Sequence, residues 1–76
     1  MNEEVIIYTI REVAALLHTS PNLVYKLIEK GLLSSIRIGS LKVLKSSLID
    51  FLNKYNGKDL SDLDNIVPIL EILNAE

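Results

Sequence analysis

The side chains of this sequence that could do chemistry are amide, hydroxyl and cationic groups of the kind that bind an anion. Asn22 and Lys26 are four residues apart, so they share one face of any helix that contains both. On a duplex, such an amide can pair with adenine edges, and such an ammonium can reach guanine or a phosphate. Tyr25 can contact a phosphate, or its ring can pack on a neighbouring hairpin with only the hydroxyl exposed. An amphipathic helix has a polar outer face in any case, so the surrounding architecture decides what these residues mean.

A second pair of cations, Arg37 and Lys42, flanks the turn residues Gly39-Ser40. In a hairpin with a two-residue type II′ loop, Arg37 and Lys42 lie directly opposite each other, where like charges are destabilising. A polyanion lying across that face relieves the repulsion; otherwise both side chains turn into solvent. The pair favours a hairpin that contacts phosphates, with Arg11, Ser40 and Lys45 as further candidate contacts to the DNA backbone.

No residue pattern indicates catalysis, a metal or a cofactor. His18 is the only histidine, there is no Cys, and no carboxylates cluster near His18, so its expected place is at the end of a helix. The sequence has no Gly-rich phosphate loop and no Gly-x-Ser-x-Gly turn, and a chain this short rarely builds an enclosed active site. We expect a protein that is not an enzyme.

The elements that must position these residues follow from local signals. Residues 5–8 are β-branched and aromatic, which predicts a strand. Thr9 and Glu12 form a capping box for a first helix. Ser20-Pro21 starts a second helix, residues 20–30, because Ser is a good N-cap and Pro is tolerated at the first helical position. Gly31 ends it.

A hairpin over residues 36–44 follows, with Ile38 opposite Leu41 and Ile36 opposite Val43. A third helix is expected next, capped by Ser46 or Ser47 and ended by Asn56-Gly57. Its predicted buried face consists of Leu48, Phe51 and Leu52. The predicted fold is mainly α with a small β-hairpin, a winged helix-turn-helix in the order β-α-α-β-β-α plus a C-terminal helix.

This ordered set resembles the helix-turn-helix domain of phage excisionase-like proteins, a relative of the MerR-type winged helix. The matching pieces are YTIREVAALLHTSPNLVYKLIEKGLL, IRIG, a short turn and SSLIDFL, about 45 of the 76 residues. The resemblance implies a recognition helix, residues 20–30, in the major groove and a wing, residues 36–44, on the backbone or minor groove. Three features depart from the family pattern: Pro21 stands where Arg is frequent, the hairpin turn is one residue short without a basic cluster, and an acidic, apolar tail is added.

Charge divides the chain into two parts. The net charge is −2, yet residues 8–56 carry seven basic and three acidic groups, a net of +4. Residues 57–76 carry one basic and five acidic groups, a net of −4. We therefore expect a DNA-binding domain over residues 1–56 and an acidic extension over residues 57–76, with DNA binding that is modest and sensitive to salt.

The extension is predicted to hold a helix that starts near Asn65 and contains Pro68 in its first turn. Its apolar positions are Leu63, Ile66, Val67, Leu70 and Leu73. These side chains can fold back on the protein's own core, or they can form an oligomer interface or bind a partner. With no signal-peptide pattern and no membrane-length apolar run, the expected location is the cytoplasm, away from membranes.

Two functions remain open from the sequence. The first is a sequence-specific duplex DNA-binding protein, acting as a transcriptional regulator or as a recombination directionality factor that bends DNA for an integrase. A module this small contacts few base pairs, so a homodimer or cooperative neighbours on DNA would supply the missing specificity. The alternative is a protein-interaction module that keeps the winged fold without binding DNA, which the acidic total and the reduced wing favour.

Overall fold

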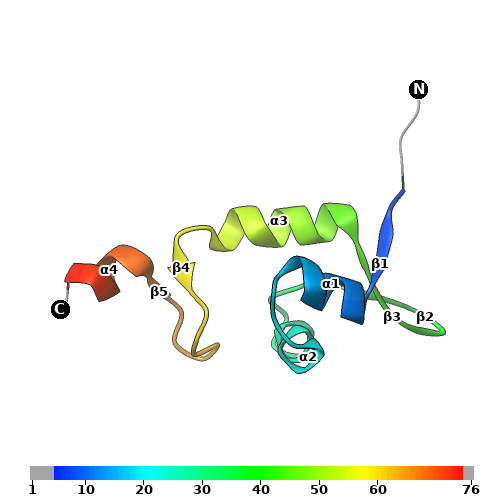
Figure 1. The fold of residues 1–76 in the computed structure, drawn as a ribbon, viewed down its shortest axis with the longest axis horizontal. Coiled ribbons are helices and arrows are strands. Elements are labelled where there is room, and N and C mark those ends of the chain that lie inside the picture. The colour runs from blue at the N-terminus through cyan, green and yellow to red at the C-terminus, as the bar shows by residue number, and fades with distance from the viewer. Residues whose placement is uncertain (1–4, 75–76) are drawn as a thin grey trace.

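The chain folds as a winged helix-turn-helix followed by a small C-terminal extension (Figure 1). The computed structural model describes residues 5–74, the last of them by its backbone alone. The helices α1 and α2 lie against one side of α3, with the sheet at one end of the molecule and the extension at the other. The elements are β1 (Ile7–Thr9), α1 (Ile10–Leu16), α2 (Pro21–Glu29), β2 (Ile36–Ile38), β3 (Ser40–Leu44), α3 (Lys45–Tyr55), β4 (Lys58–Asp59), β5 (Val67–Pro68) and α4 (Ile69–Asn74). The predicted fold class is confirmed.

Both helices of the helix-turn-helix begin with the predicted caps. The Thr9 amide donates to Glu12 Oε1 at 2.8 Å, and the Glu12 amide donates to Thr9 Oγ1 at 3.1 Å. At the start of α2 the Leu23 amide donates to Ser20 Oγ at 3.3 Å, with Pro21 as the first helical residue. Because a cap satisfies amides that the helix itself leaves unpaired, these contacts fix where each helix begins.

The same two helices end in the same way. After α1, His18 adopts a φ of +55° and the amide of Thr19 donates to Ala14 O at 2.8 Å. After α2, Gly31 adopts a φ of +78° and the amide of Leu32 donates to Leu27 O at 2.9 Å. Both are Schellman ends, in which a left-handed residue turns the chain back over the last helical carbonyls. His18, expected near the helix end, lies one residue beyond the C-cap Leu17.

The sheet has the strand order β1-β3-β2. β1 runs over Ile7–Thr9, two residues later at its start than predicted, and places Tyr8 opposite Val43. In the β2–β3 hairpin Ile36 lies opposite Lys42 and Ile38 opposite Ser40. The predicted register is wrong by one residue, because Gly39, with a φ of +74°, reverses the chain alone, whereas two turn residues were expected.

The core lies where the three helices meet β3. Among residues 5–73 the buried side chains are all apolar and come from α1, α2, the following loop, β3 and α3: Ile10, Val13, Ala14, Val24, Leu27, Leu33, Val43, Leu48 and Phe51. Ala14 lets α2 pack closely on α1. Leu52, predicted to be buried, is 46% exposed.

The start of α3 also differs from the prediction. Ser46 and Ser47 were expected to cap this helix, but it begins at Lys45 with Leu44 as N-cap and no side-chain cap. The strand β3 runs directly into the helix, and the Lys45 amide donates to Ile6 O at 2.9 Å. A backbone carbonyl therefore satisfies the amide at the strand–helix junction, and the serines lie inside the first turn. The predicted end, at Asn56-Gly57, is confirmed by the C-cap Asn56.

The extension forms a two-stranded hairpin and a short helix. β4 and β5 pair through Lys58–Pro68 and Asp59–Val67, and the Ile69 amide donates to Gly57 O at 2.9 Å. The helix begins at Ile69, so the prediction of a start near Asn65 with Pro68 inside is wrong. The residue before a proline is disfavoured in the α region, which delays the helix until Pro68 has passed. None of the helices within residues 5–74 has the length and apolar character needed to span a membrane.

Candidate nucleic-acid interface

The outer face of α2 carries the side chains that the sequence put forward for DNA contact. Val24 and Leu27 are buried against α1 and α3, which turns the opposite face of the helix to solvent. Asn22 and Lys26 are exposed on that face, and Tyr25 is 50% exposed. The N-cap Ser20 is exposed as well, although its hydroxyl accepts the hydrogen bond from Leu23. An amide, a phenol and an ammonium are thus displayed together on one rigid helix.

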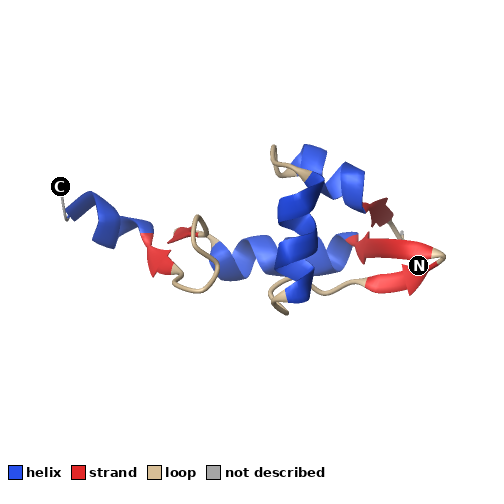
Figure 2. Cartoon of the chain, turned by 90° about the horizontal axis from the view of Figure 1, so that it is seen from below, coloured by secondary structure: helices blue, strands red, loops and turns tan. Residues whose placement is uncertain are grey.

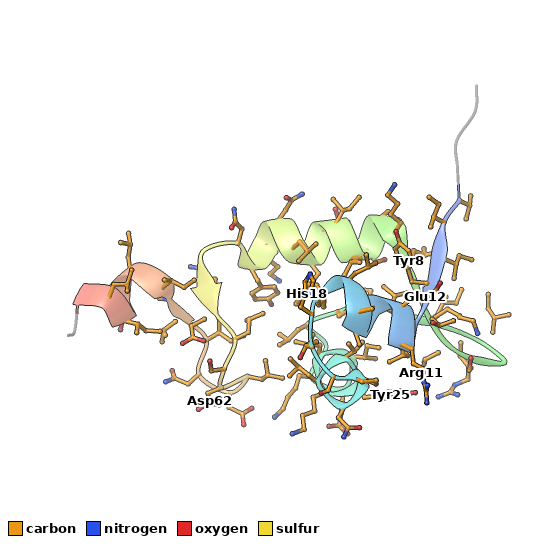
Figure 3. All side chains as sticks on the ribbon, viewed as in Figure 1. Tyr8, Arg11, Glu12, His18, Tyr25 and Asp62 are labelled. Atoms are coloured by element: carbon orange, nitrogen blue, oxygen red, sulfur yellow. The ribbon has the colours of Figure 1, made fainter. Side chains whose placement is uncertain are left out.

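Two other segments flank α2. Figure 2 views the molecule from below and shows α2 crossing in front of α3, between the β2–β3 hairpin on one side and the loop joining β4 to β5 on the other. In Figure 3 the side chains of Arg11 and Tyr25 project toward the same lower edge of the molecule, and Asp62 lies at that edge on the far side of α2. A duplex that approaches α2 from this side meets the hairpin on one flank and the extension on the other.

The register of the wing separates its two cations. Arg37 lies opposite Leu41, on the sheet face that holds the buried Val43. Lys42 lies on the outer face, where its Nζ donates to Ser40 Oγ at 2.7 Å and to Ile38 O at 3.4 Å. The predicted juxtaposition of Arg37 and Lys42 is therefore wrong, and no like-charge repulsion between directly paired residues needs a polyanion to relieve it.

The other two candidate cations, Arg11 and Lys45, lie on different edges of the molecule. Arg11 is exposed in the first turn of α1, next to α2. Lys45 is the first residue of α3, which runs along the opposite edge of the molecule from α2. The structure thus gathers Ser20, Asn22, Tyr25, Lys26 and Arg11 around α2, adds Arg37, Ser40 and Lys42 at the wing, and leaves Lys45 apart.

A contact that the sequence did not predict joins α2 to the extension. Lys30 Nζ lies 2.6 Å from Asp64 Oδ1, and the two side chains are 42% and 75% exposed. The hydrogen bond to Asp64, with the charge of that carboxylate, raises the pKa of Lys30 above its ordinary value of 10.5. An open hollow of about 410 Å³ lies beside the pair, lined by Leu23, Lys26, Glu29 and Lys30 from α2 and by residues 61–64. Only the opposite charge of the two segments hinted at this contact.

The apolar residues of the extension divide into two groups. Leu63 packs against the core together with Leu60, and Ile66 and Val67 are partly buried. On α4, Leu70 is 69% and Leu73 is 61% exposed. Leu63 thus folds back on the core, and an oligomer interface or partner contact stays a prediction for Leu70 and Leu73, which are exposed.

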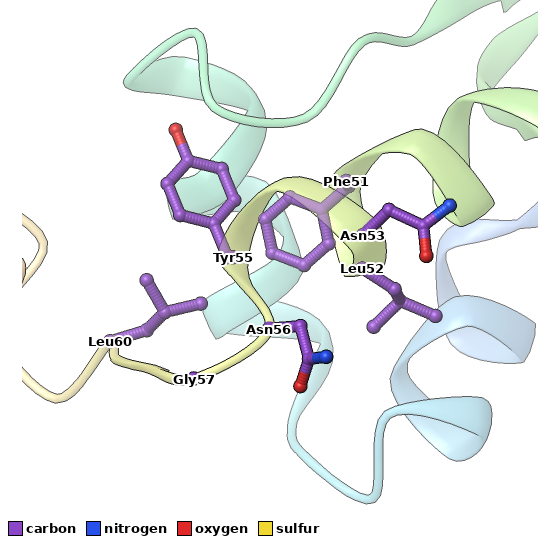
Figure 4. Close-up of a pocket in the computed structure, with 7 residues that line it drawn as sticks. All are labelled: Phe51, Leu52, Asn53, Tyr55, Asn56, Gly57 and Leu60. Carbon is purple, nitrogen blue, oxygen red and sulfur yellow. The ribbon is translucent and has the colours of Figure 1, made fainter. Parts of the chain in front are cut away.

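Hollows also lie away from the outer face of α2. Figure 4 shows one of about 390 Å³ at the end of α3, lined by apolar and amide side chains that include Phe51, Leu52 and Leu60. Within residues 5–74 no three or more His, Cys, Asp or Glu side chains come close enough together to hold a metal ion. The surface whose side chains best suit contact with DNA is therefore the outer face of α2 together with Arg11 and the wing.

Comparison with known proteins matches the same part of the chain. A family model described as a helix-turn-helix domain covers residues 7–56, which run from the start of β1 to the C-cap of α3. The searches of curated proteins and of solved structures return no match. The match ends where the acidic extension begins.

Proposed function

The chain belongs to the helix-turn-helix domain family, and from this we propose that it binds duplex DNA, with α2 in the major groove and the β2–β3 hairpin on the backbone or minor groove. The observation that carries the proposal is the outer face of α2. Asn22, Tyr25 and Lys26 are exposed there on a helix whose inner face is buried. A helix held in this way can enter the groove without changing the core.

Each side chain has a role that follows from its chemistry. Asn22, at the start of α2, pairs with adenine edges, and Lys26 contacts guanine or a phosphate. Tyr25 presents its hydroxyl to a phosphate. Arg11 and Arg37 bind phosphates on either side of the groove, with Ser40 and Lys42 at the tip of the wing. Phosphate contacts set position, and base contacts set sequence preference.

The biological role that fits is a transcriptional regulator or an excisionase-like recombination directionality factor. A single domain of this size contacts few base pairs, which favours binding as a homodimer or as cooperative neighbours. The exposed Leu70 and Leu73 of α4 offer an apolar surface for such pairing. The two roles separate by genomic context: an adjacent integrase gene supports the recombination role and names the integrase as partner.

A mobility-shift assay on a random duplex pool tests DNA binding directly. The expected result is retardation at about 50 mM salt that weakens steeply by about 200 mM, since counterion release makes phosphate contacts salt-dependent. Sequencing the retarded fraction after several rounds of selection then gives the preferred site. Absence of retardation at the lower salt concentration would refute the proposal.

One observation favours the alternative, a protein-interaction module with the same fold. Ile36 and Ile38 are 43% and 57% exposed on the wing, where a DNA-binding hairpin gains more from polar or basic side chains. If DNA is not retarded, this apolar wing is the surface on which to look for a protein partner.

A further inference from the structure

The loop that joins β4 to β5 is held in a defined shape. We call residues 61–64 the acidic loop. The Ser61 amide and hydroxyl both donate to Asp59 Oδ1, at 2.9 and 2.6 Å, and the Asp64 amide donates to Asp62 Oδ1 at 3.0 Å. These bonds turn the chain tightly, so the carboxylates of Asp62 and Asp64 are presented from a fixed turn.

Apolar contacts, and not only the ion pair, hold the acidic loop beside α2. Leu60, just before the loop, and Leu63, within it, are partly buried against the core. The β4–β5 pairing closes the loop at its base. Neutralising the carboxylates of Asp62 and Asp64 should therefore leave the position of the loop unchanged, so the effect of their charge can be tested by itself.

The carboxylates of the acidic loop lie beside Lys26 and Lys30, where a DNA backbone would lie if this flank of α2 contacted a duplex. Asp64 Oδ1 accepts from Lys30 Nζ at 2.6 Å, and Lys26 lines the same hollow as Asp62 and Asp64. Lys26 and Lys30 are four residues apart, so they form one flank of α2. A carboxylate and a phosphate are both anionic oxygen acceptors for an ammonium. The Lys30 ammonium has three donors, but a phosphate that bonds to it stands close to the Asp64 carboxylate, and the two negative charges repel each other.

On top of the DNA binding proposed above, we propose that the acidic loop competes with DNA for the Lys26 and Lys30 flank of α2, where Lys26 contacts guanine or a phosphate and Lys30 contacts a phosphate. The extension thereby lowers the affinity of its own helix-turn-helix for any duplex. DNA that binds along this flank meets the repulsion of two carboxylates, or has to displace Asp64 from Lys30. The extension lies beyond the stretch that matches the helix-turn-helix family, so this device is added to the domain and is not part of it.

The test compares two charge-matched double variants of the full chain. In the first, Asp62→Asn and Asp64→Asn remove two charges from the loop while the amide oxygen keeps the acceptor for the turn. In the control, Asp50→Asn and Glu71→Gln remove two exposed charges from α3 and α4, away from the loop. Affinity is measured by fluorescence anisotropy on a labelled random-sequence duplex, and thermal melting verifies that each variant is folded.

The loop variant should bind about five-fold more tightly than the wild type at about 50 mM salt, with a smaller gap at about 200 mM. The control should change affinity less than about two-fold, because screening weakens charges far from the duplex. Equal tightening in both variants, or none in either, would overturn the competition while leaving DNA binding intact. Absence of binding by every protein would overturn the proposed function as well, whereas binding by the loop variant alone would support both.

Discussion

Arg37 lies directly opposite Leu41 across the β2–β3 hairpin, so its guanidinium extends from the sheet face that also holds Val43 and Tyr8. Lys42 lies on the other face, bound to Ser40 and to the carbonyl of Ile38. The two cations of the wing therefore point away from opposite faces of the hairpin, so each would contact a duplex through a different phosphate. This arrangement makes the contribution of each cation to DNA affinity measurable by itself.

Alanine substitutions on α2 and on the wing should have different consequences. Arg37→Ala and Lys42→Ala remove phosphate contacts, so each weakens binding to all duplexes alike and lowers the salt slope by about one. Lys26→Ala removes a contact to base edges, so it changes the preferred sequence. Selection from a random pool, with salt titrations on one duplex, measures both effects. A uniform loss of affinity for all three variants would mean that α2 does not read the sequence.

Removing a helix cap should cost stability only where the structure has a cap. Ser20→Ala removes the acceptor for the Leu23 amide and should lower the free energy of unfolding by about 1 kcal/mol. Thr9→Ala breaks the capping box of α1 and should cost a similar amount, about 1 kcal/mol. Ser46→Ala is the matched control, because α3 has no side-chain cap. Urea denaturation gives the values, and a loss for Ser46→Ala as large as for Ser20→Ala would contradict the observed start of α3.

Two leucines that look alike in the sequence should respond differently to truncation. Leu27 is 2% exposed, so Leu27→Ala leaves a cavity and should lower the free energy of unfolding by about 3 kcal/mol. Leu52 is 46% exposed, so Leu52→Ala should cost less than about 1 kcal/mol. Thermal melts of the two variants compare them directly. Similar destabilisation by both variants would contradict the exposed position of Leu52.

Acid titration should report the turn that shapes the acidic loop. The side-chain hydrogen bond from Ser61, reinforced by the Ser61 amide, lowers the pKa of Asp59 below its ordinary value of 3.8. A lowered folded-state pKa means that the contact stabilises the fold above about pH 3.8 and is lost as pH falls through the lower, folded-state value. Ser61→Ala should return the pKa of Asp59 toward 3.8, as measured by carbon-13 NMR of the carboxyl group. Ser34→Ala, an exposed serine elsewhere, is the control and should leave the titration of Asp59 unchanged.

The sequence alone determined the helix-turn-helix, because its boundaries depend on neighbouring residues. The Thr9–Glu12 capping box, the Ser20-Pro21 start and the Gly31 end each act within four residues, and all three appear where they were expected. Val24 and Leu27, three residues apart and so on one side of a helix, form the buried side of α2. The exposed face of α2 followed from that, and with it most of the candidate site.

Tertiary structure decided the wing and the extension. Either one or two residues could turn the chain at Gly39, and pairing of β3 with both neighbours set the register that separates Arg37 from Lys42. The Ile6 carbonyl took the place of a serine cap at α3.

The pairing of Lys30 with Asp64 joins residues 34 positions apart. No local rule connects them, since the packing of Leu60 and Leu63 on the core and the pairing of β4 with β5 bring the acidic loop beside α2. The sequence thus determined which surface is the candidate for contact with DNA. The tertiary structure decided what lies next to that surface, because contacts between distant segments depend on how the whole chain packs.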